Sequence, residues 1–313
     1  MKKSAKNRII IWSIASVLLI GVLIAGIFCA SNFPVFKLFS INSGDILPDW
    51  DGYKTASGNV DFASDDISKI SVKWISGNVS IESSTDNKIE ISETSSTDIT
   101  EEKAMQYKLS SDGTLSIYSS KSISNFSFWS TDTSKNLVIK VPQNKMLHSF
   151  DISTTSADVE ITSIKADETD FETTSGEITL NDITGENTEI SSTSGKVDID
   201  GNISGEISVD TVSGDLNVNS DCRKLNADSI SGKISATLGN SISQTDASTV
   251  SGNISLSLPE NINGFSADYS SVSGNFSCDF EGISNDNSFK YKNTGAEFNF
   301  DTVSGEMRIE KIK

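Results

Sequence analysis

The stretch TVSGDLNV, residues 211–218, returns with small changes along the second half of the chain. Close copies are TTSGEITL from Thr173, STSGKVDI from Ser192, SISGKISA from Ser229, TVSGNISL from Thr249, SVSGNFSC from Ser271 and TVSGEMRI from Thr302, with a weaker copy, TTSADVEI, from Thr154. Two earlier Ser-Gly pairs begin at Ser57 and Ser76. A phrase repeated this often indicates a structural module, because a catalytic motif would occur once.

The spacing of the phrase identifies the module. Its serines are residues 156, 175, 194, 213, 231, 251, 273 and 304, so the steps are 19, 19, 19, 18, 20, 22 and 31. The early pair, residues 57 and 76, is again 19 apart. A period of about 20 residues is typical of a solenoid, in which each repeat is one coil stacked on its neighbours.

Apolar residues inside one period describe the coil. Counted from the motif serine, they occur at minus four (Phe171, Ile190, Val209, Ala227, Ala247, Tyr269, Phe300), at plus three (Val159, Ile178, Val197, Leu216, Ile234, Ile254, Phe276, Met307) and at plus five (Ile161, Leu180, Ile199, Val218, Ala236, Leu256, Cys278, Ile309). Alternation with polar residues predicts strands with one buried face. We therefore expect an all-β fold, a parallel β-solenoid (β-helix) of about 19–20-residue coils stacked roughly 4.8 Å apart. The motif glycine would sit at a bend, where backbones approach closely.

One outward column supports in-register stacking. At plus two the residues are Asp158, Glu177, Lys196, Asp215, Lys233, Asn253, Asn275 and Glu306. The charge alternates in sign from residue 177 to residue 233, and opposite charges on neighbouring strands stabilise a sheet by roughly 0.2–1 kcal/mol per pair.

The N-terminus has the pattern of a membrane anchor. Residues 1–8 form a basic head with Lys2, Lys3, Lys6 and Arg8, and residues 9–30 carry no charge. This stretch is long enough for one transmembrane helix, and the basic head predicts a cytosolic N-terminus with the C-terminal domain extracellular. The alternative is cleavage, for which Cys29-Ala30-Ser31 is the best candidate site. Residues 31–52 would be a juxtamembrane linker. Residues 53–313 would form the solenoid ectodomain, regular over 151–313 and less regular over 83–150, with a short helix within 98–109 and an aromatic cluster at 124–130.

The charge narrows the choice of partners. The chain has a net charge of −18, and without the four basic residues of the first 30 positions it would be −22. Such a surface is unsuited to nucleic acid or anionic headgroups. Cys29 lies in the expected span, and Cys222 and Cys278 fall nearly three coils apart, which is too far for a disulfide.

Reactive groups are sparse. His148 is the single histidine, there are three arginines (Arg8, Arg223, Arg308), and no cluster of His or Cys suggests a metal site. Asp170, Asp210, Asp228 and Asp301 recur at or near a corner, where Asp usually caps the backbone. Stacked carboxylates could alternatively bind Ca²⁺ or act as an acid–base pair on a glycan. The sequence predicts no catalytic residue, no metal and no cofactor.

The basic head, the single span, the strand VIKVP (residues 138–142) and the repeated T-x-SG-x-h-x-h units, where h is an apolar residue, resemble the bacterial putative-adhesin family of β-strand-repeat domains of unknown function. That family includes the membrane-anchored surface protein of the Lia envelope-stress operon of Gram-positive bacteria. The resemblance covers residues 53–313 and implies a cell-surface binding or scaffold module that engages cell-wall polymers or envelope proteins. Two alternatives remain: an accessory or sensory component of an envelope-stress response, and a polysaccharide-acting β-helix enzyme.

Overall fold

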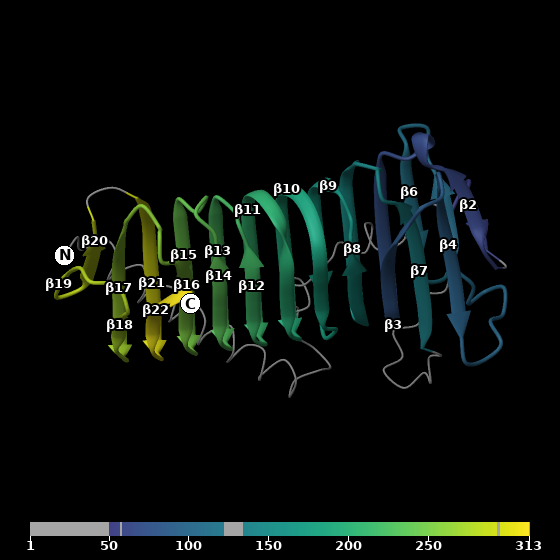
Figure 1. The fold of residues 1–313 in the computed structure, drawn as a ribbon. Coiled ribbons are helices and arrows are strands. Elements are labelled where there is room, and N and C mark those ends of the chain that lie inside the picture. The colour runs from purple at the N-terminus through teal and green to yellow at the C-terminus, as the bar shows by residue number, and fades with distance from the viewer. Residues whose placement is uncertain (1–49, 57, 122–133, 293–294, 313) are drawn as a thin grey trace, which may run out of the picture. The chain divides into compact units, whose positions relative to one another are not determined.

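The structure, a computed structural model, describes residues 50–56, 58–121, 134–292 and 295–312. The expected basic head, transmembrane helix and most of the linker lie outside these residues, as does the aromatic cluster at 124–130. None of the helices within the described part has the length and apolar character needed to cross a membrane. Residues Tyr53–Lys313 group into one compact unit, which is almost entirely β-strand (Figure 1).

The described residues form 22 strands joined into one continuous sheet. Their bounds are β1 Lys54–Thr55, β2 Val60–Ala63, β3 Lys69–Ser84, β4 Lys88–Ser95, β5 Gln106–Leu109, β6 Thr114–Tyr118, β7 Lys135–Pro142, β8 Leu147–Thr162, β9 Ala166–Thr173, β10 Ile178–Ser194, β11 Val197–Ser213, β12 Leu216–Ser220, β13 Lys224–Ser231, β14 Ile234–Leu238, β15 Gln244–Ser251, β16 Ile254–Pro259, β17 Phe265–Ser273, β18 Phe276–Cys278, β19 Ile283–Asn285, β20 Ser288–Tyr291, β21 Ala296–Ser304 and β22 Met307–Ile312.

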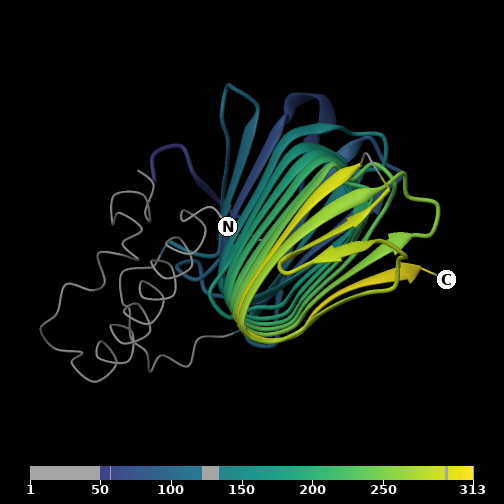
Figure 2. The same cartoon turned by 90° about the vertical axis from the view of Figure 1, so that its left-hand side faces the viewer.

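Each coil places one strand segment before its Ser-Gly pair and one after it, so the stack has two layers. We call them the pre-motif layer and the post-motif layer. The longest strands run through both: the first part of β11 pairs with β12 in the post-motif layer, and its second part pairs with β13 in the pre-motif layer, both in parallel. Figure 2 shows these coils stacked behind one another. The predicted all-β solenoid architecture is therefore confirmed.

The predicted apolar columns form the core, except in the coil of Ser273, where Tyr269, Phe276 and Cys278 are only partly buried and pack against it. Leu216 is 1% exposed and is paired with Val197 on one side and Ile234 on the other. The structure adds two buried columns that the sequence analysis left out. One lies at minus six and mixes threonine with larger apolar residues, such as Thr188, Ile207, Leu225, Thr245 and Phe298. The other lies where the coil turns back and includes Ile164, Ile183, Ile203, Cys222, Ile242 and Ile262.

The motif glycines form a column at the bend between the two layers, as predicted. A Cβ atom built on Gly214 would collide with the carbonyl oxygen of Gly195, and one built on Gly232 would collide with that of Gly214. The backbones of successive coils therefore approach too closely for any side chain. This contact explains why glycine follows serine in nearly every copy of the phrase.

The coils do not all stack in sequence order. The last coil, β21 with β22, inserts between two earlier ones: β21 pairs with β15 and with β17, and β22 pairs with β16 and with β18. At the other end, β3 lies between β8 and the pair β6 and β7. The long step of 31 residues in the repeat contains the β19–β20 hairpin, whose β20 strand covers β17 antiparallel and turns the chain back toward the stack.

Antiparallel strands also cover the N-terminal end of the stack. β4 pairs antiparallel with β7 and with β2, and β5 pairs antiparallel with β6 and with β1. The expected helix within residues 98–109 is wrong, because Gln106–Leu109 is strand β5. These antiparallel strands prevent a further parallel coil, or another chain, from pairing with this end of the sheet.

One buried ion pair fastens this N-terminal region. Lys135 Nζ lies 2.5 Å from Glu93 Oε1, with side chains 9% and 4% exposed. Lys135 also donates to the carbonyl oxygens of Lys103 and Ser119, and its ammonium lies over the ring of Trp74. The Trp74 indole N–H donates in turn to the carbonyl oxygen of Lys135 at 2.9 Å.

Candidate functional site

A groove follows the stacking direction where the post-motif segments end. Its volume is about 520 Å³, and it is lined by Asn181, Asp182, Asp200, Gly201, Asn202, Asn219, Ser220, Asp221, Thr237, Leu238, Gly239, Pro259 and Ile312. We call it the ladder groove. Since β10, β11, β12, β14, β16 and β22 are successive neighbours in this layer, the lining residues come from six adjacent coils.

The side chains of the ladder groove are small and polar at one end and apolar at the other. Asn219 donates to Asp200 Oδ1 at 3.2 Å, and Asp221 accepts from the N–H and the hydroxyl of Ser241. Asn181 and Asp182 are exposed. At the far end Pro259 and Ile312 contribute apolar surface above the buried Leu238. This arrangement can bind through hydrogen bonds and C–H contacts.

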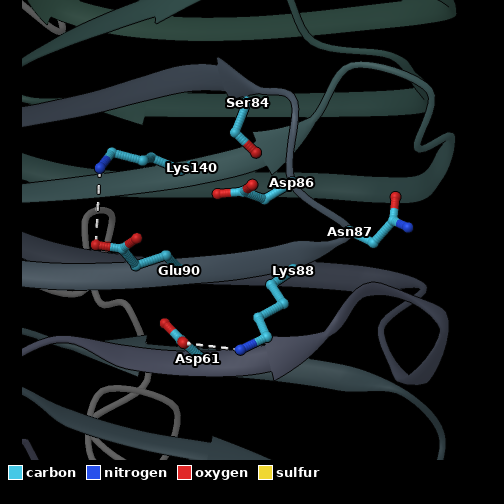
Figure 3. A pocket seen from close by; sticks show the side chains of 7 residues that line it. All are labelled: Asp61, Ser84, Asp86, Asn87, Lys88, Glu90 and Lys140. Atoms are coloured by element: carbon cyan, nitrogen blue, oxygen red, sulfur yellow. Dashed lines mark hydrogen bonds and ion pairs between the residues drawn. The ribbon is translucent and has the colours of Figure 1, made fainter.

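A smaller hollow of about 350 Å³ lies at the N-terminal end, lined by Asp61, Ser84, Asp86, Asn87, Lys88, Glu90 and Lys140 (Figure 3). Most of its charges are already paired. Lys88 Nζ is 3.4 Å from Asp61, Lys140 Nζ is 3.7 Å from Glu90, and the amide of Asn59 donates to Glu90 at 2.7 Å. The hollow therefore holds mostly paired charges, and Asp86 is its one carboxylate without an ion-pair partner among the described residues.

The recurrent aspartates lie on the outer face of the pre-motif layer. Asp210, Asp228 and Asp301 share one column, with Ser248 between the last two, and Asp170 belongs to the neighbouring column with Asp151 and Glu189. They are strand residues of β11, β13, β21 and β9, so the expected position at or near a corner is wrong. The reason is that residues three and five positions before the motif serine precede the bend and point outward from a strand.

Three carboxyls of this column, those of Asp210, Asp228 and Asp301, have raised pKa values. Burial raises the pKa of Asp210, and the charges of Asp228 and Glu189 raise it further. The pKa of Asp228 is raised by burial and by Asp246, against a lowering hydrogen bond from Ser248. Burial raises the pKa of Asp301, and the charges of Asp228 and Asp246 raise it further. Partial burial is the main cause of these shifts, and repulsion between neighbouring carboxylates adds to it.

The plus-two column is in register as predicted, but its main contacts differ from ion pairs between coils. Asp158 accepts the backbone N–H of Glu177 at 2.9 Å, and Asp215 accepts that of Lys233 at 2.8 Å. Lys196 pairs with Asp198 of its own coil at 2.6 Å. That hydrogen bond raises the pKa of Lys196, and the charges of Glu177 and Asp215 raise it further. Short acidic side chains thus tie successive coils together at the bend.

The remaining candidate groups stay apart from one another. His148 lies 3.6 Å from Asp167, and both side chains are about half exposed. Cys222 is buried, which raises the pKa of its thiol to about 12, and Cys278 is a second free thiol. Within the described ranges no three His, Cys, Asp or Glu side chains are grouped so that they could hold a metal ion.

Sequence reasoning missed the ladder groove and the Lys135–Glu93 pair. The groove is built at the return turns, where the repeat length varies between 18 and 20 residues and no phrase recurs. Its one available signal was the row Asn181, Asp200, Asn219 and Thr237, which stands six positions after the motif serine.

Comparisons place this fold among known proteins. Two solved structures are similar: a putative cell adhesion protein from Clostridium sporogenes, with 14% identity over 83% of this chain and 100% of that one and a TM-score of 0.31, and a putative adhesin from Bacteroides fragilis, with 15% identity over 81% and 96% and a TM-score of 0.39. No curated protein matches the chain. The model of the family described as Toastrack DUF4097 matches residues 67–310. The chain therefore belongs to the Toastrack DUF4097 family.

Proposed function

We propose that this protein is a single-pass, membrane-anchored surface module that binds envelope components and catalyses no reaction. The observation that carries the proposal is the ladder groove, in which four adjacent coils contribute a row of amide, carboxylate and hydroxyl groups and two further coils contribute Pro259 and Ile312. A surface of this kind offers many weak, repeated contacts, which suits a binding scaffold.

The surface location rests on the sequence. Residues 1–8 are basic and residues 9–30 carry no charge, which favours a span with residues 31–313 outside the cell. Protease added to intact protoplasts should then degrade residues 53–313. Protection of that region until the protoplasts are lysed would refute this topology.

The lack of catalysis rests on the geometry of the reactive groups. General acid–base chemistry near neutral pH needs a group whose pKa lies near 7 and a partner within reach of the substrate. His148 pairs with Asp167 at the surface, and the carboxylates of the pre-motif layer lie on the outer face of a sheet and line neither the ladder groove nor the smaller hollow. Asp210 and Asp228 are adjacent because coils stack, which is a consequence of the fold.

The purified ectodomain, residues 53–313, tests the proposal directly. It should sediment with cell-wall material and release no soluble product from that material by mass spectrometry. Failure to sediment with cell walls or membranes would exclude the binding role. Product that disappears in Asp210→Asn or Asp228→Asn would instead support the polysaccharide-acting enzyme.

A further inference from the structure

We infer that the ladder groove binds an extended, uncharged polysaccharide chain lying along the stacking direction, with about one sugar residue per coil. This inference rests on the proposed binding function and names the class of ligand. It starts from the direction of the groove, which crosses the strands of β10, β11, β12, β14, β16 and β22 in that order.

The repeat distance fits a linear glycan. Neighbouring strands lie about 4.8 Å apart, so the six coils that line the groove span roughly 24 Å. An extended β-linked sugar chain advances by a similar distance for each residue. Asn181, Asp200, Asn219 and Thr237 hold the same place in four successive coils and so offer one polar side chain per sugar.

The chemistry of the lining favours hydroxyl groups over charges. Amide and carboxylate groups are planar and carry hydrogen-bond donors or acceptors side by side, so each can bind two neighbouring hydroxyl groups of a sugar. Asp182, Asp200 and Asp221 make the groove repel a polyanion such as a phosphate-linked polymer. Beyond the polar row, Pro259 and Ile312 provide apolar surface for the C–H face of a sugar ring.

The groove is partly organised before any ligand arrives. The hydrogen bond from Asn219 to Asp200 fixes both side chains in neighbouring coils. Asp221 is held by the N–H and hydroxyl of Ser241, at 2.9 and 3.0 Å. Asn181 and Asn202 are exposed, and their side-chain amides make no hydrogen bond to another described residue, so these amides are available to a ligand. Preorganisation of this kind lowers the entropic cost of binding.

The experiment measures binding of the ectodomain to β-linked neutral oligosaccharides of two to eight residues by calorimetry. Affinity should rise with length and level off at about five or six residues, when the groove is filled. The double variant Asn181→Ala, Asn202→Ala should weaken binding about tenfold or more and leave the unfolding midpoint unchanged, because neither side-chain amide has a partner among the described residues. Asn275→Ala, an exposed asparagine at the motif bend of a different coil, is the matched control and should bind like the native chain.

Three outcomes would overturn the inference. Absence of binding to every neutral oligosaccharide would do so, as would affinity independent of chain length. The third is binding to cell walls that the double variant retains, in which case the general binding function stands and only the groove assignment fails. A salt titration of the binding to cell walls tests a different class of partner: binding that falls steeply with ionic strength would indicate a polycation at the carboxylates and would also overturn the inference.

Discussion

Asp210 and Asp228 lie directly opposite each other on the parallel strands β11 and β13, both on the outer face of the pre-motif layer. Burial and the neighbouring charges raise the pKa of each carboxyl. A carboxyl whose pKa is higher in the folded state than in the unfolded chain binds protons more tightly when folded. At a pH above the pKa of the folded state, such an ionised carboxyl therefore lowers the free energy of unfolding. This destabilisation disappears as the pH falls from the pKa of the folded state to the pKa of the unfolded chain.

Asp210→Asn should accordingly stabilise the protein at pH 7. Like charges directly opposite each other cost about 0.2–1 kcal/mol, and solvent screening at this exposed position favours the lower half of that range. The gain should shrink as the pH is lowered into the titration range of the carboxyls. Urea unfolding of the native chain and of Asp210→Asn, at pH 7 and at acidic pH, measures this difference in the free energy of unfolding.

Asp286→Asn, in the turn between β19 and β20, is the control for charge removal alone. It should change the unfolding free energy by much less than Asp210→Asn at pH 7. An equal gain in the two variants would show that total charge matters, rather than the contact between Asp210 and Asp228.

The inward column gives a second prediction. Leu216 is fully enclosed between Val197 and Ile234, so Leu216→Ala should lower the free energy of unfolding by about 2–5 kcal/mol through lost burial and a cavity. Asn217, the next residue, points outward and donates to Asp198 at 2.7 Å. Asn217→Ala should cost only about 0.5–1.5 kcal/mol. Chemical denaturation compares the two, and similar losses would contradict the assignment of the faces.

The glycine column gives a third. In Gly214→Ala the new methyl group would meet the carbonyl oxygen of Gly195, which backbone movement alone can relieve. Overpacking of this kind costs about 1–3 kcal/mol. Ser213→Ala, one residue earlier and exposed, should change stability by less than about 0.5 kcal/mol. A neutral Gly214→Ala would mean that the coils have room to separate at the bend.

The periodicity of the sequence was sufficient to predict the coil and its apolar columns, because each buried column repeats the same class of residue at a fixed distance from Ser213 and its equivalents. It was insufficient to predict the order of the coils. Every coil carries nearly the same phrase, so Ser251 would pair in register equally well with Ser273 or with Ser304. The choice depends on packing at the end of the stack, where Phe265 contacts Phe280 and Phe298.

The candidate site was harder to predict for a different reason. The groove is formed by return turns of unequal length, and its residues become neighbours only after stacking. The Lys135–Glu93 contact joins residues 42 positions apart in the least regular part of the chain. Neither residue belongs to a repeated pattern that periodicity could detect.

That ion pair gives a fourth prediction. Lys135→Met leaves the Glu93 carboxylate buried without its cation, which typically costs about 3–5 kcal/mol. The double variant Lys135→Met, Glu93→Leu removes both charges and should recover most of that loss. Denaturation of the single and double variants measures the coupling. Additive losses would show that Lys135 acts mainly through its carbonyl contacts with Lys103 and Ser119.

The inserted last coil gives the final prediction. Truncation after Gly295 removes β21 and β22, and with them the parallel partner of β17 and the buried side chains of Phe298, Phe300, Met307 and Ile309. Because coils in a solenoid contact only their neighbours, hydrogen exchange should show loss of protection in β17 and β20 and retained protection in β10 and β11. Arg308→Ala, which removes surface contacts to Asp279 and Glu310, should leave β17 protected. If β17 keeps its protection in the truncated chain, it has moved against β15 with Ser273 beside Ser251, and the inserted coil is dispensable for closing the stack.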